Sequence, residues 1–422
     1  MLSAEDNQLL TRTDAGTAMG ELFRRFWLPG LLSEEVPAPN CPPVRIRLLG
    51  EDLVAFRDSS GRVGVMQAWC PHRGAPLFFG RNEEDGLRCV YHGWKFDVAG
   101  NCLDLPNAPE GENYRARVRI AAYPAIDRGG IVWVFMGPPS AVPPLPDYPW
   151  FDLPASHRYV RKYFQECNYL QAVEGTIDMS HVRFLHSTLD QNASNPANAI
   201  SNAAILNSVL PETLGLDETP LGLRWEYKVG QLVGVINIVW PALATVGAAG
   251  PGMQSVQPRV PVDDMHSLVF RLRWSEKPIP QDEIAQYRFG TFFPQEVPGT
   301  FLMAENRRND YLIDRIAQKY YSYTGISSIP AQDLAVQENQ RGPIMDRTKE
   351  HLVSTDDVII RLRQMMLRMA RDLANGREPE APRHGQLMRN LRAGNCRVPD
   401  GADPKATVKA LARLDADAPA AA

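Results

Sequence analysis

The chain has 422 residues, of which 44% are hydrophobic and 22% are charged, and its formal net charge is −4. This length exceeds one typical domain and favours two or three, and we expect two. Because 45 basic residues are matched by 49 acidic residues without a long run of either sign, neither nucleic acid nor an anionic membrane surface is favoured as a partner.

Cysteine usage and the first residues bear on the cellular compartment. The six cysteines show no small-domain disulfide pattern, and the opening MLSAEDNQLL lacks the basic segment and apolar core of a signal peptide. We therefore expect a cytoplasmic protein with reduced thiols.

Short β-rich runs dominate the chain from about 42 to 137. They are VRIRLLG, LVAFRD, GVMQAWC and GIVWVFMG, and Gly and Asp turns separate them. This pattern predicts a small antiparallel β domain.

Two pairs of cysteine and histidine interrupt this domain. One residue separates Cys70 from His72, and two residues separate Cys89 from His92 further along the chain. A Rieske [2Fe–2S] cluster takes two thiolates on one iron and two imidazoles on the other. The alternative is a structural zinc site, but zinc modules usually pair Cys-x2-Cys with two histidines or with a second Cys-x2-Cys. Because each loop here carries one residue of each kind, we interpret the four residues as cluster ligands.

The residues around these pairs are CPHRGAPL at 70–77 and CVYHGWKFD at 89–97. They include Gly74 and Gly93, which suit tight turns. Respiratory-type Rieske domains carry an additional cysteine in each loop, whereas residues such as Ala75 and Tyr91 occupy the comparable places here. The loops therefore indicate the oxygenase branch of Rieske domains.

The proline-rich stretch GPPSAVPPLPDYPW at 137–150 is the expected linker, because proline disfavours both helices and central strands. We assign residues 1–145 to an N-terminal segment with the Rieske domain, and residues 146–422 to a catalytic domain. Within the second domain, the polar stretch 190–208 is expected to be a mobile loop or lid, and HSLVFRLRW at 266–274 a strand.

The apolar stretch from Leu232 to Gly252 has about the length that a membrane-spanning helix requires. Pro241, several glycines and β-branched residues such as Val233 and Ile236 favour two buried strands around a break instead.

Near the C-terminus, Ser354 and Asp357 suit the start of a helix that ends at Asn375-Gly376. Its apolar residues recur at intervals of three and four, at Ile359, Leu362, Met366, Met369 and Leu373. This period predicts a helix packed on the core. The Ala- and Asp-rich tail from about 402 is expected to be a surface helix fragment with a frayed end.

A second candidate metal site lies in EGTIDMSH, which ends at His181 and is followed by His186. Asp178 precedes the first histidine by three residues. Residues five apart are about 140° out of alignment on a helix, so the two histidines converge only if the helix bends or ends between them. Two histidines and a carboxylate with open positions are typical of iron(II) sites for dioxygen chemistry. The alternative is that they are ordinary core or surface residues.

Together, CPHRG, CVYHGWKFD and NYLQAVEGTIDMSHVRFLH at 168–186 resemble the oxygenase component of Rieske non-haem iron aromatic-ring oxygenases, especially the phthalate dioxygenase-like group. TFLMAENRRNDYLIDR at 300–315, YTGISSIPAQD at 323–333 and QENQRGPIMDRTKEHL at 337–352 extend the resemblance over most of the chain. It implies an α+β fold, with an N-terminal antiparallel β Rieske domain followed by a catalytic domain whose antiparallel sheet is flanked by helices.

The resemblance also implies the ligands of a mononuclear Fe(II), which are His181, His186 and a later aspartate. Asp333 matches the family's pattern best, and Asp346 is the second choice. Asp178 is implied to hydrogen-bond both His181 and His92 of a neighbouring subunit, and so to connect the two metal centres. Asn168 and Glu174 lie where family members place residues near the iron, and we assign them no role.

The implied function is that of a terminal oxygenase, which activates O2 with electrons from the Rieske cluster and forms a cis-dihydrodiol, a phenol or an O-demethylated catechol. Because the chain lacks a G-x-G-x-x-G fingerprint, we expect a separate flavin- and iron–sulfur-containing reductase that uses NADH. The family suggests a homotrimer or a hexamer. Two other classes stay open: an electron-transfer Rieske protein without oxygenase activity, and a zinc-binding regulatory or hydrolytic protein.

The expected substrate is an aromatic acid or a similar ring in an apolar cavity, with the strand around Ile236, Ile238 and Trp240 as one wall. Phthalate enzymes hold their dicarboxylate with arginines just after the iron helix, but residues 187–223 contain no Lys or Arg. We therefore expect a monocarboxylated, methoxylated or sulfonated ring rather than phthalate. Arg224 and Arg271 are the candidates for one anionic group.

Overall fold

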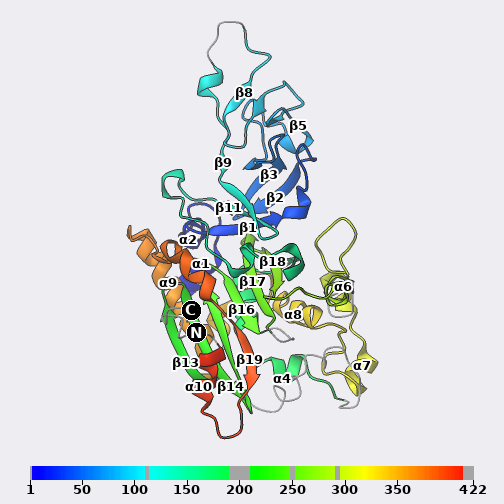
Figure 1. Ribbon diagram of the computed structural model, residues 1–422, viewed down its shortest axis with the longest axis vertical. Helices are drawn as coiled ribbons and strands as arrows, with labels where there is room; N and C mark the ends of the chain where they lie inside the picture. Colours follow the sequence, from blue (N-terminus) through cyan, green and yellow to red (C-terminus); the bar gives the residue numbers. More distant parts are fainter. Residues whose placement is uncertain (1, 110–113, 190–209, 248–251, 290–294, 412–422) are drawn as a thin grey trace.

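The structure is a computed structural model that describes residues 2–109, 114–189, 210–247, 252–289 and 295–411. In Figure 1 a β-rich N-terminal part forms the upper end, and a larger sheet with helices forms the lower end. The expected α+β class, with an antiparallel β domain followed by an antiparallel sheet flanked by helices, is confirmed.

The upper part contains two four-stranded antiparallel sheets. The first has the order β2 (Val44–Leu48), β3 (Glu51–Arg57), β4 (Val63–Gln67) and β9 (Ala122–Tyr123). The second has the order β5 (Arg81–Glu83), β6 (Gly86–Arg88), β7 (Lys95–Phe96) and β8 (Cys102–Asp104). Buried apolar side chains such as Phe56, Leu87 and Phe96 pack between them and form one core with Cys70 and Cys89. The burial of this core fixes the loops that carry the two cysteines.

A third sheet, of three strands, lies below these two. Its order is β1 (Trp27–Leu32), β11 (Ile131–Phe135) and β10 (Ala125–Arg128). The proline-rich stretch that follows forms only 3-10 turns, as its composition predicts. It is not a free linker, because Tyr148 and Trp150 are buried in the core and Trp27 Nε1 donates to Pro143 O at 2.9 Å.

The N-terminal segment packs against the C-terminal part of the molecule. α1 (Ala4–Thr11) and α2 (Ala18–Phe23) contact α9 (Asp357–Ala374). Phe23 meets the ring of Tyr169 edge-on, and the Tyr169 hydroxyl donates to Leu10 O at 2.7 Å. Residues from opposite ends of the chain thus share one core.

The lower part is built on a twisted antiparallel sheet. Its order is β12 (Arg158–Gln165), β18 (His266–Trp274), β17 (Gln254–Asp263), β16 (Leu243–Gly247), β15 (Leu232–Val239), β14 (Gly222–Val229) and β13 (Glu212–Thr219), and β19 (Gly394–Arg397) also pairs with β15. The apolar stretch after Leu232 forms the buried strands β15 and β16 with a break at Pro241, which confirms the prediction of two strands.

The described helices of the lower part are α3 (Tyr169–Ile177), α4 (Val182–Leu185), α6 (Gln281–Phe289), α7 (Arg315–Tyr320), α8 (Ile329–Gln337), α9 and α10 (Pro404–Leu411). Of these, α3 and α10 contact strands of the sheet. α9 confirms the helix predicted from its apolar period, since Ile359, Leu362 and Met366 are buried. One turn of 3-10 helix, Ser354–Asp356, precedes it.

α10 shows that the tail is more than a surface fragment. Val408 is fully buried and packs with Val233 and Val235 of β15. The helix predicted in the tail is therefore described up to residue 411, but its expected frayed end lies outside the described residues. The expected lid at 190–208 also lies outside the described residues.

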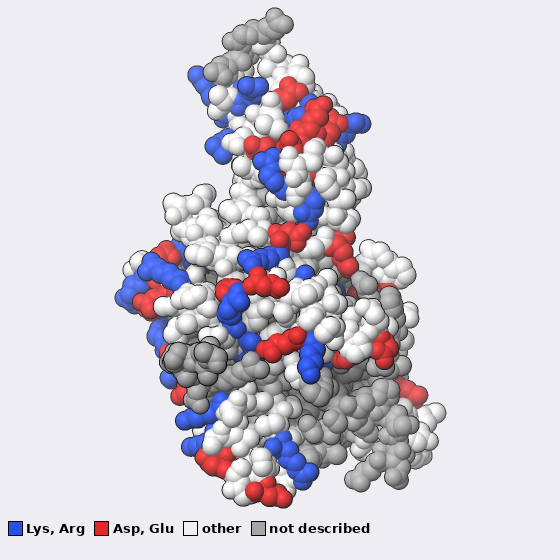
Figure 2. Space-filling model, in the orientation of Figure 1, with Lys and Arg blue, Asp and Glu red and all other residues white. Residues whose placement is uncertain are grey.

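Two surface properties accompany this fold. Figure 2 shows Lys and Arg interspersed with Asp and Glu on the visible face. Among the helices of the described residues, none combines the length and the apolar character needed to cross a membrane.

Candidate metal centres

The two Cys-His loops have the same backbone hydrogen bonds. Cys70 N donates to Ala75 O at 2.8 Å and Gly74 N donates to Cys70 O at 2.9 Å. In the second loop, Cys89 N donates to Trp94 O at 2.8 Å and Gly93 N to Cys89 O at 3.0 Å. Both glycines have positive φ, 68° and 76°, which a residue with a Cβ adopts at a cost. The two Cys-His segments therefore form turns of the same kind.

These turns bring like residues together. The Cys70 and Cys89 thiols contact each other and are both 2% exposed, and burial raises the pKa of Cys70 to about 11. The His72 and His92 ring centroids are 4.5 Å apart. The ring centroids of Trp94 and His72 are 4.4 Å apart in a stacked arrangement, and the buried Nδ1 of His72 has no hydrogen-bond partner among the residues that the structure describes. Two paired thiols beside two paired imidazoles fit a [2Fe–2S] cluster with two ligands of each kind.

The second centre is formed where α3 has ended. α3 stops at Ile177, and the next helix, α4, is a single turn that His181 precedes and His186 follows. This break lets both imidazoles face the same point, as the sequence argument required. The two Nε2 atoms are 3.3 Å apart.

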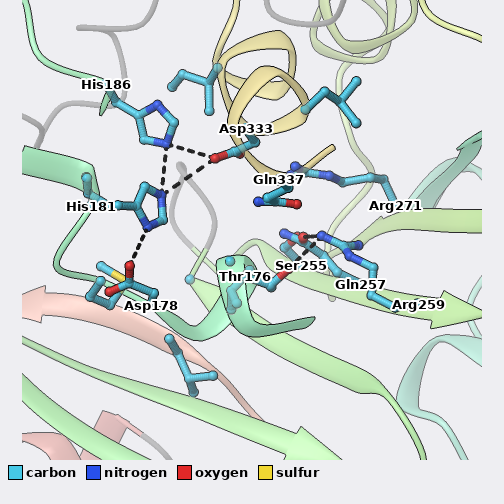
Figure 3. A pocket seen from close by; sticks show the side chains of 18 of the residues that line it. Thr176, Asp178, His181, His186, Ser255, Gln257, Arg259, Arg271, Asp333 and Gln337 are labelled. Atoms are coloured by element: carbon cyan, nitrogen blue, oxygen red, sulfur yellow. Dashed lines mark hydrogen bonds and ion pairs between the residues drawn. The ribbon is translucent and has the colours of Figure 1, made fainter. Parts of the chain in front are cut away.

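Asp333 of α8 completes this group. Its Oδ1 lies 3.4 Å from His186 Nε2 and 3.6 Å from His181 Nε2, and the donor atoms of the three residues lie within 4.8 Å of one another. Figure 3 shows the three side chains pointing toward one another from two different segments. The sequence comparison with the oxygenases thus selected three residues that the fold does bring together.

The opposite nitrogen of each imidazole is held by a neighbour. His181 Nδ1 lies 3.3 Å from Asp178 Oδ2, and His186 Nδ1 lies 2.7 Å from Gln332 Oε1. Gln332 Nε2 in turn donates to Ile326 O at 2.9 Å, which fixes the amide with its oxygen toward the histidine. Each Nδ1 therefore carries the proton, and each Nε2 offers its lone pair to the common point. Metal-binding histidines are typically oriented by such partners.

Electrostatics at the same point favour a positive charge. Burial favours the neutral acid of Asp333, but the charges of His186 and His181 outweigh it and hold the pKa of Asp333 below its ordinary value. Burial likewise opposes the charged form of His181, but Asp178 and Asp333 raise the pKa of His181 above its ordinary value. A divalent cation at this point would replace the proton, because metal ions and protons compete for such ligands.

Three other residues named from the sequence have structural contacts instead. The Asp346 carboxylate lies 2.8 Å from Lys349 Nζ and accepts from Thr348 N, and it is not part of the metal-binding group. Asn168 caps α3 through Leu170 N at 3.1 Å.

Glu174 is the third of them. Its carboxylate is buried and forms ion pairs with Arg347 at 2.8 Å and Arg363 at 2.6 Å. Burial would raise the pKa of Glu174, but the two guanidinium groups outweigh it and lower that pKa. Glu174 therefore has a structural role, and it is not part of the group formed by His181, His186 and Asp333.

A cavity of about 210 Å³ adjoins the two histidines and Asp333. Ile236 lines it as expected, whereas Ile238 and Trp240 do not. Of the two arginines named from the sequence, Arg271 lines the cavity and Arg224 does not.

Several functional candidates in this cavity were missed from the sequence. Those that line it are Ser255, Gln257, Arg259, Arg273 and Gln337. Gln332, which contacts the metal-ligand candidate His186 from outside the cavity lining, was also missed. A signal existed, because polar residues at every second position of the apolar run QSVQPRVPV place their side chains on one face of a strand. The three cavity arginines come from β17 and β18, so the lack of Lys and Arg in 187–223 does not leave the cavity without cations. The argument against phthalate was incomplete for this reason.

Comparisons with known proteins agree with this arrangement. Residues 26–124 match the Rieske [2Fe-2S] domain, and residues 134–406 match the family described as LigXa C-terminal domain like. The chain is 36% identical to the phthalate 4,5-dioxygenase oxygenase subunit of Pseudomonas putida, over 87% of this chain and 86% of that protein. It is also 36% identical to the 3-chlorobenzoate-3,4-dioxygenase oxygenase subunit of Comamonas testosteroni, over 96% and 97%.

A solved structure has the same fold. The terminal oxygenase of carbazole 1,9a-dioxygenase from Nocardioides aromaticivorans IC177 covers 89% of this chain with a TM-score of 0.61 at 18% identity, and 98% of that chain is covered.

The fold and the two centres define a Rieske-type oxygenase. The chain belongs to the family of oxygenase subunits that join a Rieske [2Fe–2S] domain to a LigXa-like C-terminal domain. The resemblance stated from the sequence is confirmed. The alternative of a pure electron-transfer protein is not favoured, and the match to a Rieske domain counts against the zinc alternative.

Proposed function

We propose that this oxygenase hydroxylates or O-demethylates an aromatic acid at a mononuclear Fe(II) held by His181, His186 and Asp333, with O2 as co-substrate. The observation that carries the proposal is the convergence of two imidazole Nε2 atoms and one carboxylate oxygen beside a cavity. Related subunits act on benzoate-type rings, as the names phthalate 4,5-dioxygenase and 3-chlorobenzoate-3,4-dioxygenase state.

The cluster held by Cys70, His72, Cys89 and His92 would supply single electrons, and the mononuclear iron would supply the binding and reduction of O2. Asp178 Oδ2 accepts a hydrogen bond from His181 Nδ1 at 3.3 Å, and Ser180 N donates to Asp178 Oδ1 at 2.7 Å. Its carboxylate is thereby kept in position beside the histidine.

The cavity walls position the ring and limit access of water to it. Met179, Val182, Ile236, Ile329 and Leu334 give the cavity an apolar lining next to the metal ligands. An aromatic ring gains free energy by leaving water for such a surface.

We propose further that the functional enzyme is a homotrimer, or a hexamer, in the cytoplasm and receives electrons from NADH through a separate flavin- and iron–sulfur-containing reductase. Figure 1 supports the oligomer, because β5, which follows the first cluster loop, lies at the opposite end of the molecule from α4, which lies between His181 and His186. Electron transfer weakens steeply with distance, so Asp178 would hydrogen-bond His92 of a neighbouring subunit rather than its own.

The test is purification without chelators, followed by visible absorbance, metal and sulfide analysis, and coupled oxygen uptake. We expect about three irons and two sulfides per chain. We also expect NADH-dependent oxygen uptake with at least one of a set of benzoates and methoxybenzoates, with product identified by mass spectrometry.

His186→Ala provides the decisive comparison. It should lose about one iron per chain and all product formation while the visible spectrum of the cluster is unchanged. Product formation at the wild-type rate by this variant would contradict the iron assignment.

A further inference from the structure

Arg259 is a cation in an unusual place. Its side chain on β17 is 5% exposed, although arginine is almost never fully buried unless it is paired. Its hydrogen bonds go to neutral acceptors: Nη2 donates to Thr176 Oγ1 at 2.6 Å and to Gln257 Oε1 at 3.0 Å, and Nε donates to Ala172 O at 3.4 Å. Among the described residues, no carboxylate lies within ion-pair distance of it.

One nitrogen of the Arg259 guanidinium, Nη1, is not hydrogen-bonded to any described residue. This nitrogen is also buried. Burial lowers the pKa of Arg259 to about 10, so the group stays charged at neutral pH. A buried charge with an unused donor is costly unless something else completes it.

The arginine belongs to the cavity of the mononuclear centre. Figure 3 shows Arg259 and Arg271 on one side of this cavity, and His181 and His186 on the other. Arg271 lowers the pKa of Arg259 further through repulsion between like charges, although burial is the larger cause. That side of the cavity is therefore positive, and it favours a ligand with a negative charge.

The size and the remaining lining suit a single ring. A dry apolar cavity of about 150 Å³ suffices for benzene, and this one has about 210 Å³. Apolar side chains, among them Val182 and Ile236, also line this cavity. Ser255 and Gln257 share the face of β17 from which Arg259 projects and add neutral polar groups beside it.

We propose that Arg259 anchors the carboxylate of a one-ring aromatic acid, which accepts a hydrogen bond from Nη1, and that the ring then extends toward the metal ligands. Arg259 is thus a specificity-determining residue that selects anionic over neutral rings. This inference rests on the proposed function, because it takes the cavity beside His181, His186 and Asp333 to be the substrate site.

Calorimetric binding of benzoate and of its neutral isostere benzamide to the purified holoenzyme tests the anchor without turnover. The wild type should bind benzoate at least tenfold more tightly than benzamide. Arg259→Gln should weaken benzoate by about 10- to 100-fold, the cost of losing a hydrogen bond between charged groups, and leave benzamide within about threefold. Arg259→Lys keeps the charge and should retain part of the preference.

Arg224→Gln is the matched control, since this arginine lies on β14 of the same sheet but does not line the cavity. It should bind both ligands as the wild type does. The cluster spectrum and iron content of each variant report its folding, and the wild-type comparison of benzoate with benzamide needs no variant at all.

Two results would overturn the anchor. One is a wild type without preference for benzoate over benzamide, and the other is an Arg259→Gln enzyme that keeps the full preference or loses both ligands equally. If either result is found and a neutral aromatic ether still supports coupled oxygen uptake, the anchor is refuted but the proposed oxygenase function is not. Absence of mononuclear iron and of oxygen uptake with every ring would instead refute the proposed function itself.

Discussion

At the scale of single residues, Gln332 shows how a neutral side chain can control a metal ligand. Its amide oxygen accepts from His186 Nδ1 at 2.7 Å, so the proton stays on the nitrogen that faces away from the metal point. Gln332→Leu should lower iron(II) affinity by about 10- to 100-fold, the usual loss when such a partner is removed. Gln332→Glu, which keeps an acceptor, should lose much less. Anaerobic iron titration measures both variants, and equal affinities of Gln332→Leu and the wild type would contradict this role.

The same residue illustrates what the sequence predicted at this scale. His181, His186 and Asp333 were predicted because their motifs resemble a known family, and the two cysteines and two histidines of the cluster because their spacing is chemically specific. Gln332 and Arg259 carry no motif. Their importance comes from contacts between distant segments, such as the 146 positions that separate Gln332 from His186, and a single sequence does not encode such contacts visibly.

At the scale of elements, the site depends on how closely α3 approaches α8. A Cβ added at Gly175 would lie 2.2 Å from Gln337 Nε2 and 2.7 Å from its Cδ. Gln337 has little freedom to move away, because its Oε1 accepts from Gln165 at 2.8 Å and its backbone oxygen accepts from Gln171 at 2.8 Å. The glycine thus permits the contact that sets Asp333 of α8 opposite the histidines that follow α3.

Gly175→Ala should therefore loosen the iron site. Alanine favours a helix over glycine by about 1 kcal/mol, but overpacking costs about 1–3 kcal/mol, so the clash prevails. We expect roughly tenfold weaker iron(II) binding and an unchanged cluster spectrum, measured by metal titration. Adding Gln337→Ala should restore iron binding by making room for the new methyl group. An alanine variant with wild-type iron affinity would show that the close approach is not required.

Elements were predicted well where local pattern decides their structure. The strands of the Rieske domain follow from short β-rich runs between Gly and Asp turns, and α9 follows from apolar residues at intervals of three and four. The proline-rich linker was predicted only in part, because the second half of this stretch packs on distant residues. Asp147 forms an ion pair with Arg389, and the ring centroids of Trp150 and Trp274 are 6.4 Å apart. Tertiary contacts of this kind outweigh local composition.

At the scale of the whole molecule, a buried charge cluster connects α3 with α9 and lies beside the N-terminal segment. Glu174 of α3 pairs with Arg347 and with Arg363 of α9, Arg363 also pairs with Glu350, and Arg347 O accepts from Leu2 N at 3.4 Å. Removing one member of a buried ion pair typically costs about 3–5 kcal/mol, because it leaves charge uncompensated.

Glu174→Gln should lower the free energy of unfolding by about that amount at pH 7. The pKa of this carboxyl is lowered in the folded state, so its contribution is full above the unfolded value of 4.5 and is lost as the pH falls through the lower folded pKa. The difference between variant and wild type should therefore narrow in acid. Urea unfolding at pH 7 and near pH 4 measures it, with the exposed Glu380→Gln as control. A constant difference at both pH values would contradict the charge argument.

The elongated chain predicts that one subunit cannot complete the reaction alone. A Cys89→Ser variant should lack a working cluster, and a His186→Ala variant should lack the mononuclear iron, so neither alone should form product. When both are produced together with different tags, each mixed trimer contains one intact mononuclear site whose donor neighbour has an intact cluster. Doubly purified mixed trimers should therefore regain about a third of the wild-type rate per chain, whereas the two variants mixed after purification serve as the control without exchanged subunits. Mixed oligomers as inactive as their parents would show that electrons pass within each chain, and the neighbour contact between Asp178 and His92 would then have to be abandoned.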